Sequence, residues 1–232
     1  MNEVKRIFEL DVLRGVAVIL MMLFHFGYDL ALFEYTSYET TQDVEWIVFR
    51  GLILSMFLLA VGMSSYLAYK NHINYDKLIK TLVKLTLVSL VISIGSYQVF
   101  EHSWIYFGVI HFITVALILS LFFVKTPNLS LVFAFLLLGS YWLGYHPFDN
   151  LFNYSVHEWN IPVFTVDLVS LSPWFALVLL GIFVMHKNMF GFRIDENKSM
   201  KKIAYLGQHS LVIYLVHQPI LFGIFYMINV VR

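Results

Sequence analysis

The sequence predicts an all-α fold, a polytopic transmembrane helical bundle of about seven spans. Of its 232 residues, 59% are hydrophobic and only 13% are charged, whereas soluble domains carry about 25% charged residues. Apolar runs of about 20 residues, long enough to cross a bilayer, follow one another along the chain. Basic and acidic connections alternate between these runs. We therefore expect residues 1–232 to form a single integral-membrane domain.

The apolar runs and the charges between them give the spans and their orientation. The spans fall roughly at 10–33, 46–69, 79–99, 104–124, 129–146, 170–187 and 204–230. Lysine and arginine concentrate in the connections 70–84 and 187–202, whereas 34–45 and 147–169 are acidic. Because basic loops favour the cytoplasmic side, we predict a cytoplasmic N-terminus and a C-terminus outside. The long connection 147–169 is a candidate cap for a cavity.

Several classes of site are excluded or disfavoured by composition. The chain has no cysteine, which excludes disulfides, thiolate metal sites and a cysteine acyl-enzyme. Its nine histidines are scattered over different spans and loops, and no His-Glu-x-x-His, P-loop or dinucleotide motif occurs. We expect no bound metal and no nucleic-acid partner, and we expect membrane lipids to surround the chain.

One face of the first span carries four ionisable side chains. With about 100° per residue and Arg14 at zero, His25 falls at about 20° and Asp11 and Asp29 at about 60°. The rise from Asp11 to Asp29 is about 27 Å, close to the roughly 30 Å hydrocarbon core. Such groups cost at least about 2.5–3.5 kcal/mol each at membrane depth unless they are paired or wetted. This face is predicted to line a polar cavity.

Each pair on this face has two interpretations. Asp11 and Arg14 are three residues apart, so they form either a structural ion pair or an arginine held ready for a phosphate or carboxylate. Asp29 lies four residues after His25, where its carboxylate would orient the imidazole and raise its basicity, as a general base needs. The alternative is a His–Asp pair that only satisfies a helix contact. We favour a functional role for the His25–Asp29 pair.

Polar residues also mark two later spans. His111 lies early in the fourth span and, taken alone, is more often a hydrogen-bonded core residue than a catalyst. In the last span, Ser210, Tyr214 and His217 fall on one face, within about 60°. Two helical turns separate Ser210 from His217, which is too far for direct activation of a serine nucleophile. A serine hydrolase is therefore rejected.

Six segments, in order along the chain, carry the motifs that suggest a family: Arg6–Gly15, Phe24–Leu30, Phe107–Phe112, Ser172–Phe175, Gly207–Leu211 and Tyr214–Ile220. Taken together, they resemble the heparan-α-glucosaminide N-acetyltransferase catalytic-domain family, including its bacterial members. The resemblance covers nearly the whole chain, and the combination is more specific than the opening Leu-Asp-x-x-Arg-Gly element alone.

The resemblance implies transfer of an acetyl group from cytosolic acetyl-CoA to a sugar acceptor across the membrane. In a bacterial cytoplasmic membrane, that acceptor would be an envelope glycan or a lipid-linked sugar. The residues that match family positions would divide into two groups. The catalytic group contains His25, Asp29, His111 and His217, and the group that binds acetyl-CoA contains Asp11, Arg14, His209 and Gln218.

The resemblance also suggests a chemical order of events. Lysosomal members are thought to use a histidine in the loop after the first span, whereas residues 34–45 contain none here. His25 is therefore the candidate general base, with Arg14 or His217 stabilising charge on the carbonyl oxygen. Two alternatives stay open: a small transporter that uses the same polar line, and a non-catalytic membrane scaffold. A homodimer is common for membrane enzymes, although no residue here requires one.

Overall fold

The structure is a computed structural model that describes residues 6–100, 102–145, 158, 161–162, 165, 167–190 and 193–231. Within these residues it contains eight α-helices and no strand, so the predicted all-α class is confirmed for them. The described residues form two compact units, one within 6–57 and 193–231 and the other within 58–190. Helix α2 (Val44–Tyr69) contributes its first half to one unit and its second half to the other.

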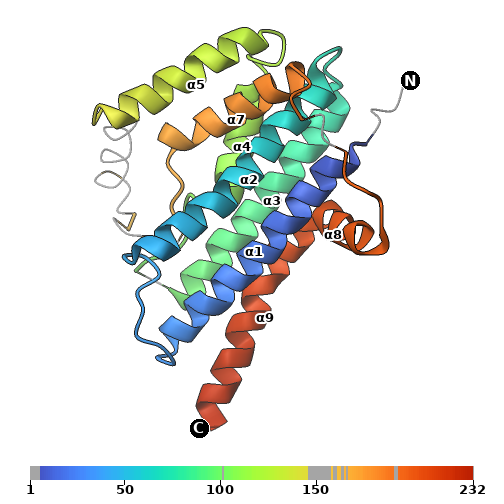
Figure 1. Cartoon of the computed structure of the whole chain (residues 1–232). Helices are drawn as coiled ribbons and strands as arrows, with labels where there is room; N and C mark the ends of the chain where they lie inside the picture. The colour runs from blue at the N-terminus through green and yellow to red at the C-terminus, as the bar shows by residue number, and fades with distance from the viewer. Residues whose placement is uncertain are drawn as a thin grey trace. The chain divides into compact units, whose positions relative to one another are not determined.

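The first unit is built around α1 (Phe8–Leu32). Helix α8 (Lys198–Gln208) and helix α9 (Ser210–Val231) both pack against α1, as Figure 1 shows. A small apolar core on α1 and α2 contains Met21, Phe24 and Ile53. Because α8 and α9 come from the other end of the chain, this packing brings the first and last polar motifs of the sequence into one unit.

The second unit contains α3 (Tyr75–Val99), α4 (Val109–Ser120), α5 (Pro127–Trp142), α7 (Leu171–His186) and the second half of α2. Helix α5 packs against α7, and α4 packs against both α3 and α7. Helix α2 approaches α7 closely at Gly62 and Gly181, where an added Cβ on either glycine would meet backbone atoms of the other helix. Small residues of this kind let membrane helices pack tightly.

Four helices, α1, α2, α3 and α9, are long and apolar enough to cross a membrane, judged by length and composition. Three others, α4, α5 and α7, are apolar but shorter, with 12, 16 and 16 residues. The predicted number of seven spans and the orientation of the termini therefore stay predictions. Most of the predicted cavity-capping connection, 147–169, lies outside the described residues.

The expectation of one continuous last span over residues 204–230 is wrong. The chain forms two helices there, because α8 ends at Gln208 and α9 begins at Ser210, with His209 between them. Helix α8 carries three lysines and an Asn197 cap whose Oδ1 accepts the Met200 N–H at 2.9 Å. Such a polar sequence favours a short amphipathic helix over an extension of a membrane span.

Candidate functional site

Asp11, near the start of α1, is buried within a cluster of donors that we call the Asp11 cluster (Arg6, Asp11, Arg14 and Gln208). Asp11 is only 3% exposed. It accepts from Arg6 Nε at 2.5 Å and from Gln208 Nε2 at 3.2 Å. Arg14 Nη1 lies 3.7 Å from Asp11 Oδ1. A buried carboxylate needs such compensation, and these three side chains supply it.

Two glycines allow α8 to approach this end of α1. A Cβ added to Gly207 would clash with the carbonyl oxygen of Asp11, and one added to Gly15 would clash with the carbonyl oxygen of Ile203. The two helices are therefore in backbone contact at these positions. This contact places Gln208, the last residue of α8, beside the Asp11 carboxylate.

The other end of α1 carries a second group, which we call the His25 cluster (His25, Asp29, His217 and Gln218). His25 of α1 and His217 of α9 face each other with ring centroids 4.6 Å apart and planes at 79°. Gln218 Nε2 donates to Asp29 Oδ1 at 2.8 Å. The two predicted catalytic histidines of the first unit are thus in contact. Asp29 and Gln218, which come from the same two helices, form a hydrogen bond with each other.

The backbone fixes the orientation of both histidine rings. His25 Nδ1 lies 3.0 Å from the carbonyl oxygen of Met21, and His217 Nδ1 lies 2.8 Å from that of Tyr214. Because a carbonyl oxygen only accepts hydrogen bonds, Nδ1 carries the proton in each neutral ring. The basic lone pair is then on Nε2. Each ring is therefore in the tautomer whose Nε2 can accept a proton.

Asp29 is fully buried, with 0% exposure. Its Oδ1 accepts the hydrogen bond from Gln218, whereas its Oδ2 has no hydrogen-bond partner among the described residues. His25 Nδ1–H donates to the carbonyl oxygen of Met21, and the predicted role of Asp29 in orienting this ring stays a prediction. Asp29 connects α1 to α9 through its hydrogen bond with Gln218.

His111 belongs to the second unit, where both of its ring nitrogens have partners. The Gly108 N–H donates to His111 Nδ1 at 3.2 Å, which leaves the proton on Nε2. His111 Nε2 lies 3.0 Å from Ser93 Oγ, and that hydroxyl donates to the carbonyl oxygen of Ile105 at 2.8 Å. This arrangement caps α4 and ties it to α3. The predicted catalytic role of His111 stays a prediction.

His209, the predicted contact for acetyl-CoA, is exposed at the junction of α8 and α9. Its Nδ1 donates to the carbonyl oxygen of Tyr205 at 2.9 Å, and its ring lies against the Tyr205 ring.

Two residues outside the predicted site, Arg6 and Gln208, form hydrogen bonds with Asp11. Gln208 precedes His209 within Gly207–Leu211, one of the segments that resemble the family, so the sequence did contain a signal for Gln208.

Among the described residues, no group of three or more His, Asp or Glu side chains is arranged to hold a metal ion.

Comparison with known families gives a match over residues 6–219. This segment, which covers most of the 232-residue chain, matches the family model "Heparan-alpha-glucosaminide N-acetyltransferase, catalytic" and confirms the resemblance. No curated protein and no solved structure matches the chain.

Proposed function

The chain belongs to the heparan-α-glucosaminide N-acetyltransferase catalytic family, and from this premise we propose that it transfers acetyl from acetyl-CoA to a sugar across a membrane. Members of this family in general take the acetyl group from acetyl-CoA. The four long apolar helices and the family together indicate a membrane protein. The observation that carries the proposal is the pair of polar clusters at the two ends of α1.

The Asp11 cluster is the proposed binding site for the CoA phosphates. Arg14 keeps 28% of its side chain exposed while Asp11 holds it from one side. A guanidinium presents several N–H donors in a fixed plane, so one edge can bind Asp11 while another binds a phosphate. His209 and Gln218 were predicted to join this site, and His209 is the one whose exposed position on the α8–α9 junction suits a large ligand.

The spacing along α1 fits one extended ligand. His25 follows Arg14 by eleven positions, a rise of about 16 Å on about the same face of the helix. Acetyl-CoA carries its phosphates and its thioester at opposite ends of a long pantetheine arm. A single molecule bound by its phosphates at Arg14 therefore reaches toward His25 with its acetyl group.

The His25 cluster is the proposed place of transfer. His25 Nε2 takes the proton from the acceptor hydroxyl or amine as the acceptor atom forms a bond to the acetyl carbonyl carbon. The C–S bond of the thioester breaks, and the CoA thiolate leaves and takes up a proton. His217, whose ring touches that of His25, stabilises negative charge on the carbonyl oxygen when its Nε2 is protonated.

Asp29 and Gln218 act as positioning residues in this proposal. Their hydrogen bond joins α1 to α9 one turn after His25 and one residue after His217. It therefore sets how the two imidazoles face each other. Catalysis by a pair of groups depends on such alignment, since small misplacements cost large factors in rate.

The proposal includes a location and an acceptor class. The basic connections 70–84 and 187–202 favour an N-terminus on the cytoplasmic side, where acetyl-CoA is made, and a C-terminus outside. With seven spans, the His25 end of α1 faces outward. The acceptor is then an envelope glycan or a lipid-linked sugar at the outer face of a bacterial cytoplasmic membrane.

Acetyl-CoA binding to the purified full chain tests this function. In non-ionic detergent, we expect acetyl-CoA to raise the thermal unfolding midpoint in a saturable manner, with acetate as the control. No response of a well-folded protein would contradict the acetyltransferase and would turn attention to transport of a small molecule along the same polar face.

A further inference from the structure

Helix α8 has an exposed basic face for which the proposed acetyl transfer gives no role. Its Ala204 and Gly207 are buried, whereas Lys198, Lys201 and Lys202 are exposed. Helix α8 thus uses one side for packing and presents three ammonium groups on the other. A short helix with this division of apolar and basic sides is typical of the membrane–water interface.

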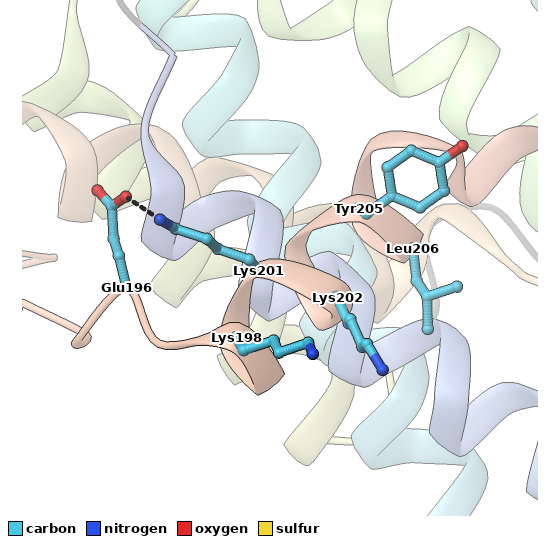
Figure 2. Close-up of a pocket in the computed structure, with 6 residues that line it drawn as sticks. All are labelled: Glu196, Lys198, Lys201, Lys202, Tyr205 and Leu206. Atoms are coloured by element: carbon cyan, nitrogen blue, oxygen red, sulfur yellow. Dashed lines mark ion pairs between the residues drawn. The ribbon is translucent and has the colours of Figure 1, made fainter.

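These lysines line an open depression of about 800 Å³ on the first unit. Figure 2 shows that Lys201 points to Glu196, with which it forms an ion pair at 3.8 Å. Lys198 and Lys202 extend instead toward a common side of the depression, and neither forms an ion pair within the described part of the chain. The remaining lining residues are Tyr205 and Leu206.

The spacing of Lys198 and Lys202 makes the two charges unfavourable in isolation. They are four residues apart in one helix, and like charges at this spacing repel each other. An anion held between the two ammonium groups removes this repulsion. Phosphate suits the position, because lysine binds it as a point charge and phosphate oxygens accept several hydrogen bonds.

The neighbouring elements have the features expected close to a membrane surface. Helix α8 ends at Gln208, and α9, which is long and apolar enough to span a bilayer, begins two residues later. Tyr205 is 60% exposed beside the lysines, as tyrosines commonly are at the headgroup level. Basic residues at this level are attracted to anionic lipids.

We propose that Lys198 and Lys202 form a binding site for the phosphate of an anionic phospholipid headgroup. The apolar body of Tyr205 and Leu206 lies beside the lipid's glycerol region, and Glu196 holds Lys201 away from the bound phosphate. This inference goes beyond acetyl transfer. The bound phospholipid holds α8 against the membrane surface independently of any acetyl donor.

Lipid-dependent stability of the full-length protein tests the proposal. Thermal unfolding is followed in non-ionic detergent while phosphatidylglycerol or phosphatidylcholine is added. We expect saturable stabilisation by phosphatidylglycerol, with an apparent affinity about 30-fold weaker in K198Q/K202Q, since each lysine near an anionic surface contributes about fivefold. K198R/K202R keeps both charges and should retain the response.

The chain offers a matched control in α3. Lys80 and Lys84 are also exposed and four residues apart, but they do not line the depression. K80Q/K84Q should respond to phosphatidylglycerol as the wild type does. An equal loss in both double variants, or none in either, would overturn the site.

A second arm separates lipid from soluble phosphate compounds. Adenosine 3′,5′-bisphosphate replaces the lipid in the same measurement. If K198Q/K202Q loses the response to this nucleotide but keeps the one to phosphatidylglycerol, the lipid proposal is overturned. None of these readouts uses acetyl transfer, so their failure is distinct from failure of the proposed function.

Discussion

Two carboxylates on the same helix have opposite environments. Asp11 and Asp29 are both buried on α1, at 3% and 0% exposure. Asp11 is surrounded by Arg6, Arg14 and Gln208. Asp29 accepts one hydrogen bond, from the neutral Gln218, and forms no ion pair within the described residues.

This difference suits the Asp11 end of α1 to binding a ligand and the Asp29 end to reacting with it. At the Asp11 end, cations are assembled and one of them, Arg14, stays partly exposed, which suits binding of an anion. At the Asp29 end, two imidazoles meet in the tautomer that accepts a proton at Nε2. The comparison therefore predicts that changes at one end alter binding of acetyl-CoA, whereas changes at the other alter its chemistry.

The largest effect is expected for His25→Ala. Loss of a general base lowers the rate of acetyl transfer by about 10²–10⁴-fold, while the Kd for acetyl-CoA stays within about threefold, because the CoA phosphates are bound at the other end. Release of the CoA thiol in the presence of glucosamine measures the rate. His102→Ala, at an exposed position of the second unit, is the control. A His25→Ala enzyme with wild-type turnover would remove His25 from the chemistry.

Arg14→Ala should show the reverse pattern. A charge-assisted hydrogen bond contributes about 1.5–3 kcal/mol, so the Kd for acetyl-CoA should rise by about 10–150-fold. Arg14→Lys keeps the charge and should recover part of the loss, because lysine lacks the planar donor arrangement. Titration calorimetry measures both. Unchanged affinity in Arg14→Ala would move the donor site away from the Asp11 cluster.

Gly207→Ala disturbs the Asp11 end through packing alone. Its new methyl group would clash with the Asp11 carbonyl oxygen, so α8 must shift, and overpacking of this kind costs about 1–3 kcal/mol. Gly223 of α9 has nothing within 4 Å of an added Cβ. Gly223→Ala should be neutral or stabilising by up to about 1 kcal/mol. Equal unfolding midpoints for the two variants in detergent would contradict the close contact of α1 and α8.

The smallest effects compare the amides that serve the two carboxylates. Gln218→Ala removes the hydrogen bond to Asp29 and leaves a buried carboxylate, at a cost of about 1–3 kcal/mol. Gln208→Ala should cost less than about 1 kcal/mol, since Arg6 and Arg14 still compensate Asp11. Thermal unfolding ranks the two variants. A larger loss in Gln208→Ala would reverse our view of the two environments.

Local helical geometry made one part of the site predictable from sequence. The common face of Asp11, Arg14, His25 and Asp29 follows from the helix period, and α1 indeed runs unbroken from Phe8 to Leu32. The Asp11–Arg14 ion pair, three residues apart, follows from the same geometry.

Contacts between distant segments were not predictable in the same way. Gln218 and Asp29 are 189 residues apart, and Gln208 and Asp11 are 197 apart, so no period links them. The Met21 carbonyl that orients His25 was also missed, because backbone acceptors leave no trace in side-chain patterns. Hydropathy likewise merged the end of α8 with α9, since Ile203 to Leu206 is apolar enough to extend the run.

Transfer between two compartments tests the central claim most directly. The full chain is reconstituted into vesicles with acetyl-CoA outside and glucosamine enclosed, neither of which crosses the bilayer unaided. If donor binding and transfer lie at opposite ends of α1, acetylated glucosamine should accumulate inside, and His25→Ala vesicles should form little of it. Acetylation only when donor and acceptor share one side would contradict the arrangement of the two clusters proposed here.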